Sequence, residues 1–232
     1  MTKKKIMMAA MSAGLVAVVG VGGTLAYLSA QTDVVENTFA VGEGYVPGPD
    51  GSKGIVLDET KVDPETGEAV EPAERTTENA YNDLLPNDDR LKDPTVWMMG
   101  GSVDSYVFVK LEGADELAAS GITIADLNTE DWQRVDGEFS LENPFDGIYQ
   151  YVGDAFGSQN GVVEVPDDPK GEKIELSKVF ETIHVSSGLT QEDLEAMKDN
   201  LGSLKLQAVA VQADNNTAEQ ALEEAKNVAD WN

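Results

Sequence analysis

The 232-residue sequence predicts a mainly β protein, an antiparallel β-sandwich with a few short helices. Three observations support this prediction. Short runs in which apolar and polar residues alternate recur along the chain, clusters of Pro, Gly, Asn and Asp separate these runs, and only brief stretches have helical spacing. Many short strands with such punctuation are typical of two packed sheets.

The N-terminus has the pattern of a secretory signal. Three lysines at positions 3–5 precede an uncharged, glycine-rich apolar run over residues 6–23. This run is at or below the roughly 20 residues that a membrane-spanning helix needs. We therefore predict a signal peptide at 1–26, cleaved by signal peptidase between Ala26 and Tyr27. The alternative is an uncleaved single-span anchor with Tyr27 at the membrane interface.

Charge and cysteine content limit the partners of the chain. The sequence has 16 basic and 43 acidic residues, a net charge of −27, and no cysteine. Such a surface repels nucleic acid and anionic lipid and favours divalent cations or basic partners. We expect no nucleic-acid partner and membrane contact only through the uncleaved signal.

Without disulfides, stability has to come from a hydrophobic core, and thiol catalysis is excluded.

After the signal we expect an N-terminal strand at 27–44 and a single sandwich domain at 45–232. Residues 42–79 are dense in Gly, Pro, Asp, Glu and Thr, with a strand-like island at 55–57. This composition predicts an acidic loop insertion around 45–80.

The clearest strand begins near Val103, where apolar residues alternate with polar or aromatic ones up to Leu111. This pattern predicts one buried face and one mixed face. Further β-rich runs occupy residues 132–135, 148–152, 161–165, 173–176, 179–185 and 204–212.

Two capping-box patterns predict helices. Residues 190–193 (TQED) precede Leu194 and Met197, and residues 217–220 (TAEQ) precede an apolar stripe at helical spacing that would pack on a sheet. A shorter helical turn is expected at 115–120.

An apolar segment, residues 95–101 (TVWMMGG), leads into the strand near Val103. We interpret it as an edge strand followed by a double-glycine turn, with Trp97 buried in the core. The alternative is that this segment forms an assembly surface.

No residue pattern indicates a catalytic centre. His184 is the only histidine, it lies in a strand-like run, and the sequence lacks HExxH and GxSxG motifs. Glu181 and His184 have ExxH spacing, but in a strand this spacing directs the two side chains to opposite faces. We expect His184 to make a structural hydrogen bond, and we expect no enzyme activity and no required cofactor.

Calcium is the most plausible ion for such an acidic chain. Oxygen-rich loop clusters occur at residues 87–89, at residues 167–168, and at Asp63 with Glu65, but none follows the order of an EF-hand loop. Solvated loops are the default interpretation, and a specific calcium site is the alternative.

Two N-terminal blocks carry a resemblance to a known family. Residues 22–29 (GGTLAYLS) and 37–42 (NTFAVG) resemble the N-terminus of the TasA/camelysin family, whose precursors are cleaved by a SipW-type signal peptidase. Leu28 stands where Phe is commoner, and Ala30 and Gln31 replace the usual acidic residue. Downstream, residues 92–96, 101–112, 179–180 and 208–213 are similar to later blocks of the family, so that the resemblance covers about half of the chain.

The resemblance implies a jelly-roll-like β-sandwich that is secreted and forms extracellular fibres of a biofilm matrix. Some members are described as casein-cleaving metalloendopeptidases, but no metal-binding motif here supports that activity. A monomeric secreted binding module, for a carbohydrate or another matrix protein, is the main alternative.

The residues themselves also suggest assembly. Cleavage would free an extended, mostly uncharged end, which can add as a strand to an exposed sheet edge of the next subunit. Head-to-tail addition does not close and therefore makes a filament, with itself or with related matrix subunits. Along this N-terminal segment the alternation of side chains shifts by one residue once, as at a β-bulge. The residues predicted to form the assembly strand are Leu28, Ala30, Val34, Val35, Phe39 and Val41.

Overall fold

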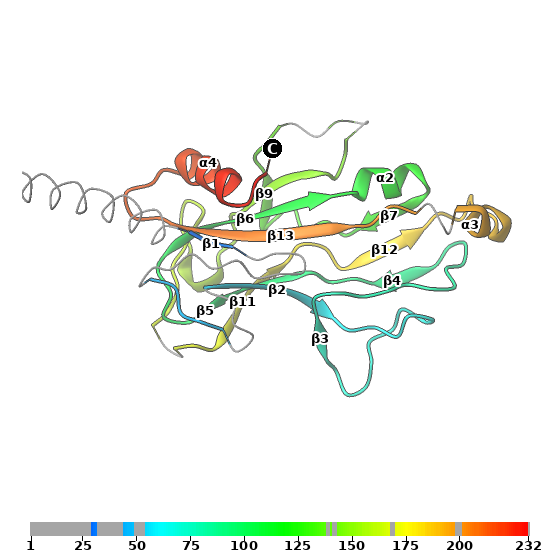
Figure 1. The fold of residues 1–232 in the computed structure, drawn as a ribbon, viewed down its shortest axis with the longest axis horizontal. Helices are drawn as coiled ribbons and strands as arrows, with labels where there is room; N and C mark the ends of the chain where they lie inside the picture. The colour runs from blue at the N-terminus through cyan, green and yellow to red at the C-terminus, as the bar shows by residue number, and fades with distance from the viewer. Residues whose placement is uncertain are drawn as a thin grey trace, which may run out of the picture.

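The computed structural model describes residues 29–31 (backbone only), 44–48, 54–137, 140, 143–167, 170–197 and 201–231. Within these residues the strands are antiparallel and form two packed layers (Figure 1). The predicted fold class was a mainly β, jelly-roll-like antiparallel sandwich with a few short helices. The structure confirms its β content, its antiparallel pairing and its helices.

The first layer is built around two long, fully paired strands. β6 and β13 run antiparallel in register from Ser105 opposite Gln212 to Glu112 opposite Lys205. The layer has the order β1 (Ser29–Gln31), β13 (Lys205–Gln212), β6 (Ser105–Glu112), β9 (Gly147–Tyr151), β8 (Trp132–Arg134), with β10 (Val162–Val163) also pairing with β6.

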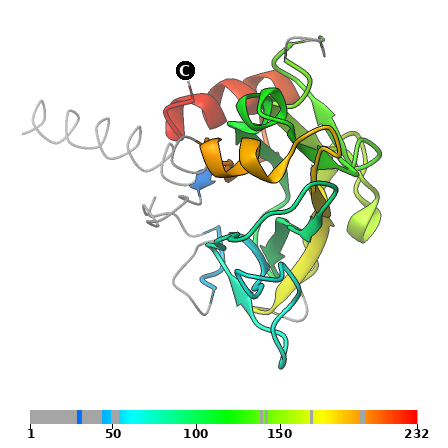
Figure 2. The ribbon, with the colours of Figure 1, turned by 90° about the vertical axis from the view of Figure 1, so that its right-hand side faces the viewer.

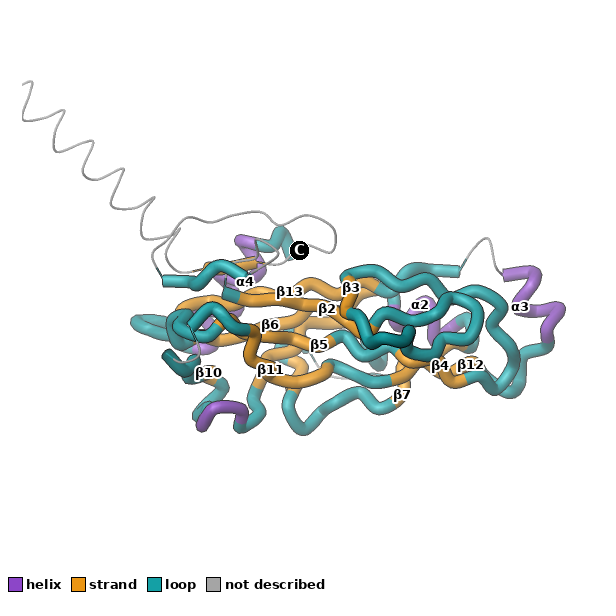
Figure 3. The backbone as a smooth tube through the Cα atoms, turned by 90° about the horizontal axis from the view of Figure 1, so that it is seen from below, coloured by secondary structure: helices purple, strands orange, loops and turns teal. Residues whose placement is uncertain are grey.

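The second layer consists of two sheets that lie end to end (Figure 3). The first sheet has the order β11 (Lys173–Lys178), β5 (Thr95–Met99), β2 (Ile55–Thr60), β3 (Arg75–Thr76). The second has the order β4 (Asp89–Leu91), β12 (Thr182–Val185), β7 (Ile122–Ala125). β4 leads into β5, and β11 leads into β12. Backbone hydrogen bonds cross the junction, from Lys92 N–H to Glu181 O (3.1 Å) and from Val179 N–H to Pro94 O (2.8 Å).

The main core lies between the layers. Val107, Val109 and Leu111 of β6 are fully buried there with Val96 and Met98 of β5. Their spacing of two follows from the pleat of a strand, which turns alternate side chains to one face. Burial of this apolar surface is the main driving force for packing the layers together.

A helix covers the outer face of the first layer. α4 (Ala218–Val228) begins at the predicted capping box, in which Thr217 Oγ1 accepts from Gln220 N–H and Gln220 Oε1 accepts from Thr217 N–H. Ala221 and Ala225 pack against Phe108 and neighbouring apolar residues, and Figure 2 shows the helix outside the sheet. On the face of β6 that we expected to be mixed, Tyr106 and Phe108 are buried beside α4, whereas Lys110 is half-buried and Glu112 is exposed.

The other two predicted helices are also present. α2 (Ala114–Ala119) begins where the Asp146 carboxylate accepts from the N–H groups of Gly113 and Ala114. α3 (Gln191–Met197) buries Leu194, and a short 3-10 turn, η1, spans Ala155–Gly157. Within the described residues, no helix is both long enough and apolar enough to span a bilayer.

The predicted edge strand with a buried Trp97 is wrong. β5 is a central strand, paired with β2 on one side and with β11 on the other. Val96 and Met98 point into the core, so Trp97 lies on the opposite, outer face and is only half-buried. The continuous apolar run left the phase of this strand undefined, because either face could have been buried.

The buried tyrosines predict loss of stability at high pH. Tyr149 is fully buried and its Oη–H donates to Phe145 O. Burial, aided by the nearby carboxylates of Asp136, Asp115 and Asp146 and opposed by Arg134, raises the pKa of Tyr149 to about 12. Because this pKa lies above the unfolded value of about 10, the stabilisation is complete below pH 10 and is lost as pH rises toward 12.

We therefore expect the free energy of unfolding in urea, followed by tryptophan fluorescence, to fall progressively between about pH 10 and 12. The Tyr149→Phe variant, which has no phenol at this site, should show a shallower fall. The prediction fails if the native protein titrates all of its tyrosines near pH 10 in absorbance at 295 nm.

Candidate assembly site

The outermost strand of the first layer comes from the N-terminal end of the chain. β1 pairs antiparallel with β13, placing Ser29 opposite Val211, Ala30 opposite Ala210 and Gln31 opposite Val209. Ala30, predicted in the assembly strand, therefore lies on β13 of its own chain. The other predicted assembly residues, Leu28, Val34, Val35, Phe39 and Val41, and the cleavage pair Ala26 and Tyr27, lie outside the described residues.

β13 has the character of an interior strand. Ala208 and Ala210 face the main core, whereas Val209 and Val211 face α4. A strand buried on both faces usually has a neighbour on each side. β6 pairs with all eight residues of β13, but β1 contributes only three residues on the other side. Within the described residues, β13 is therefore buried on both faces but paired over only three of its eight residues on the β1 side.

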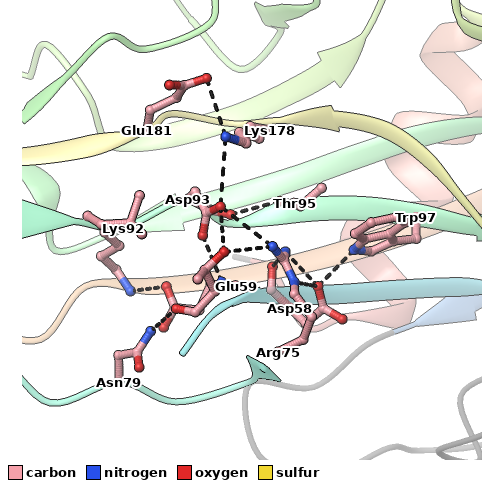
Figure 4. A network of polar contacts seen from close by, with 12 residues as sticks. Asp58, Glu59, Arg75, Asn79, Lys92, Asp93, Thr95, Trp97, Lys178 and Glu181 are labelled. Carbon is pink, nitrogen blue, oxygen red and sulfur yellow. Dashed lines mark hydrogen bonds and ion pairs between the residues drawn. The ribbon is translucent and has the colours of Figure 1, made fainter. Parts of the chain in front are cut away.

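The outer face of the second layer carries a polar network, which the sequence did not predict. The Asp58 carboxylate, 5% exposed, accepts from Arg75 Nε (2.9 Å), Trp97 Nε1 (2.7 Å) and Lys173 Nζ (2.5 Å). These four residues come from β2, β3, β5 and β11, so the contacts cross the whole four-stranded sheet. Figure 4 shows Arg75 and Trp97 directed toward Asp58. Arg75 and Lys173 also lie near the Trp97 ring, at 5.4 and 5.6 Å from its centroid.

Asp93 extends this network toward the junction of the two sheets. It accepts from the backbone N–H (2.7 Å) and Oγ1 (2.9 Å) of Thr60, and Arg75 and Lys178 approach it at 3.5 and 3.8 Å. Lys92 and Glu59 form a pair at 2.6 Å beside it.

The network is balanced in charge. Its acidic members are Asp58, Glu59, Asp93 and Glu181, and its basic members are Arg75, Lys92, Lys173 and Lys178. A quarter of the 16 basic residues of the chain are therefore paired with carboxylates in this network. Because every charge has a partner of opposite sign, the arrangement indicates a structural role.

The histidine is also structural. His184 Nδ1 lies 2.7 Å from Asp89 Oδ1, across the pair of β12 and β4, and both side chains are solvent-accessible. Glu181 instead approaches Lys178, so the ExxH spacing does not bring its two residues to one site. The expected structural hydrogen bond of His184 is confirmed.

Two of the three acidic loop clusters, at residues 87–89 and at Asp63, have partners within the protein. The Asp88 carboxylate accepts from Arg90 Nη2 (2.6 Å) and Leu85 N–H (2.9 Å), and Asp63 accepts from the N–H groups of Glu65 and Thr66. In the part of the chain that the structure describes, no three acidic or histidine side chains converge as metal ligands. Asp168 lies outside that part.

The chain matches no protein-family model, no curated protein and no solved structure. Its function has to be inferred from the sequence and the geometry of its own sheets.

The polar network predicts a large effect of one isosteric substitution. Asp58→Asn removes the charge that Arg75 and Lys173 share while keeping the shape of the side chain. Loss of one partner from a fully buried pair costs about 3–5 kcal/mol. Because the Arg75 and Lys173 side chains are 33% and 29% exposed, we expect a smaller loss of unfolding free energy, about 2 kcal/mol.

The measurement is urea unfolding of both proteins at the same ionic strength. The matched control is Glu223→Gln, whose pair with Lys226 on α4 is exposed, and we expect a change below about 0.5 kcal/mol. Equal effects of the two substitutions would contradict a stabilising role for the network.

Proposed function

We propose that this chain is a secreted structural protein of the cell surface or biofilm matrix, which polymerises into fibres by N-terminal strand addition after signal cleavage. The observation that carries the proposal is the position of β1, a short strand from the N-terminal end of the chain at the outer edge of β13. The family resemblance of the N-terminal blocks supports the same function.

Assembly would use contacts that the fold already contains. β1 contacts β13 through backbone pairing and lies beside α4. The same pairing can be made by β1 of a second molecule, because a backbone ladder does not depend on which chain supplies the strand. Exchange of an identical element between protomers is a low-cost route to association. A donor edge and an acceptor edge on different parts of each molecule make a heterologous contact, which propagates as a filament.

Charge sets the conditions for such assembly. Signal cleavage removes three lysines and no acidic residue, so the processed copies carry a net charge of −30 and repel each other. This repulsion is screened over about 10 Å at 0.1 M salt. The polar network adds no net positive surface to offset the repulsion. Backbone pairing and burial of apolar side chains therefore have to supply the attraction, and salt or divalent cations should favour assembly.

A second candidate function is a monomeric secreted binding module. The pairing of β1 with β13 of the same chain favours it, because this pairing already occupies part of the β13 edge. The two functions differ in whether β1 remains on its own molecule in solution.

Electron microscopy of two purified forms tests the proposal directly. One form begins at Tyr27 and the other at Glu43, and each is imaged by negative stain with and without calcium at physiological salt. We expect filaments from the first form only, because the second lacks the assembly strand. Isolated particles from both forms in every condition would favour the monomeric module.

An engineered disulfide reports which molecule supplies β1. The chain has no cysteine, and Ala30 lies directly opposite Ala210, a separation at which cysteines can bridge. We expect Ala30→Cys with Ala210→Cys to give a ladder of covalent oligomers on non-reducing gels after oxidation under assembly conditions. A cross-linked monomer alone would mean that β1 stays on its own chain, and each single variant serves as the control.

A further inference from the structure

A tight turn leads into β10 and carries the one Asn-Gly pair of the sequence, Asn160 and Gly161. Gln159 and Val162 face each other across this turn. Val162 N–H donates to Gln159 O (3.0 Å), and Gln159 N–H donates to Val162 O (3.3 Å). Asn160 and Gly161 both have positive φ, 55° and 76°. Two-residue turns with positive φ at both central positions favour Asn followed by Gly, so the backbone conformation accounts for this pair.

The packing of Gly161 also favours a residue without a side chain. Gly161 is buried, and a Cβ atom at this position would come too close to Nε2 of the buried Gln150 side chain on β9. A larger residue would therefore have to displace Gln150 as well as adopt a left-handed backbone. The chemical consequence is that no side chain at position 161 shields the backbone nitrogen of this residue from Asn160.

The groups that could react with each other have no competing partners. Asn160 is solvent-exposed. Within the described residues, neither its side-chain amide nor the Gly161 N–H makes a hydrogen bond. Asn128 shows the contrast, because its Nδ2 donates to Asp131 Oδ2 (2.9 Å) and to Ser177 Oγ (2.8 Å). The Asn160 amide is therefore free to move toward the nitrogen of Gly161.

We propose that Asn160 is a site of spontaneous deamidation in the folded protein. The backbone nitrogen of Gly161 attacks Cγ of Asn160, so that an N–Cγ bond forms and the Cγ–Nδ2 bond breaks. The amide group leaves as ammonia together with the proton of the Gly161 N–H, and a cyclic succinimide remains. Water then opens this ring at either carbonyl, which gives aspartate or isoaspartate. Water is the only co-reactant, and each event adds one negative charge.

The turn itself sets the rate of this reaction. Attack requires the peptide between Asn160 and Gly161 to rotate out of the left-handed conformation, which breaks both hydrogen bonds between Gln159 and Val162. Exposed turns of this kind open locally without unfolding of the whole protein. We expect the reaction to be about thirtyfold slower than in an unstructured peptide, the effect of two backbone hydrogen bonds of typical net strength.

The modification would act on the strand that follows. An isoaspartate at position 160 adds one carbon atom to the main chain of the turn. β10 pairs with β6 through only two residues, Val162 opposite Tyr106 and Val163 opposite Ser105. A lengthened turn would therefore loosen β10 at this end. Because the reaction is spontaneous, the converted fraction would rise with the time since the protein was made.

Peptide mapping by mass spectrometry tests the proposal. The folded protein and a synthetic peptide of residues 156–165 are incubated side by side at neutral pH, and aspartate and isoaspartate at position 160 are quantified over time. The matched control within the same digest is Asn143, which is also exposed but precedes Pro144. The nitrogen of a proline carries no proton, so this asparagine lacks the nucleophile that Gly161 supplies. We expect conversion at Asn160 and none above background at Asn143.

A variant assigns the change in charge to this residue. Asn160→Gly removes the side-chain amide and leaves Gly-Gly, which also suits the turn. The native protein should gain an acidic species on anion exchange over time, and the variant should not. Hydrogen exchange of the separated acidic species should be faster at residues 162–163 than in the unmodified protein.

Two outcomes would overturn the assignment. The first is a conversion rate at Asn160 in the folded protein no higher than at Asn143 while the peptide reacts, because the turn would then block the attack. The second is an acidic species that forms equally fast in the Asn160→Gly variant, because the charge would then arise at another residue.

Discussion

The pairing of β13 with β6 is the constraint on which the rest of the structure depends. The two strands match residue for residue over their whole length and lie at the centre of the first layer. Because alternate side chains of each strand point to opposite faces, the pair presents one apolar surface to the second layer and another to α4. The same pair also aligns the end of β13 with the start of β6, where Gln212, Asp104 and Asp214 line a polar cavity.

The second layer depends on charge as well as on burial. An acidic chain has few basic residues, and it places four of them beside buried carboxylates of the second layer. The network links strands that are far apart in the sequence, such as β2 and β11. Charged side chains along a sheet face and edge also discourage unwanted pairing with other molecules. The edge of the first layer at β1 and β13 is therefore a better candidate for strand addition than the charged second layer.

Much of the fold was predictable because its signals are local. Alternation over 103–111 and 204–212 predicted β6 and β13, and the TQED and TAEQ patterns predicted α3 and α4. The candidate site was predictable only in part. Part of the predicted N-terminal strand, Ser29–Gln31, is described as β1, but its pairing with β13 and the polar network each combine residues whose separation in sequence carries no periodic signal.

The sequence by itself determined the class of the fold, the main strands and helices and the acidic character of the surface, because pleat periodicity, capping and composition act over a few residues. The tertiary structure alone decided which face of β5 is buried, where Trp97 lies and which strand β1 joins. A continuous apolar run such as residues 95–99 fits either phase of a strand, and a free edge accepts any strand with a compatible register. Such choices depend on packing between segments that are distant in the chain, and they are made only when the two layers come together.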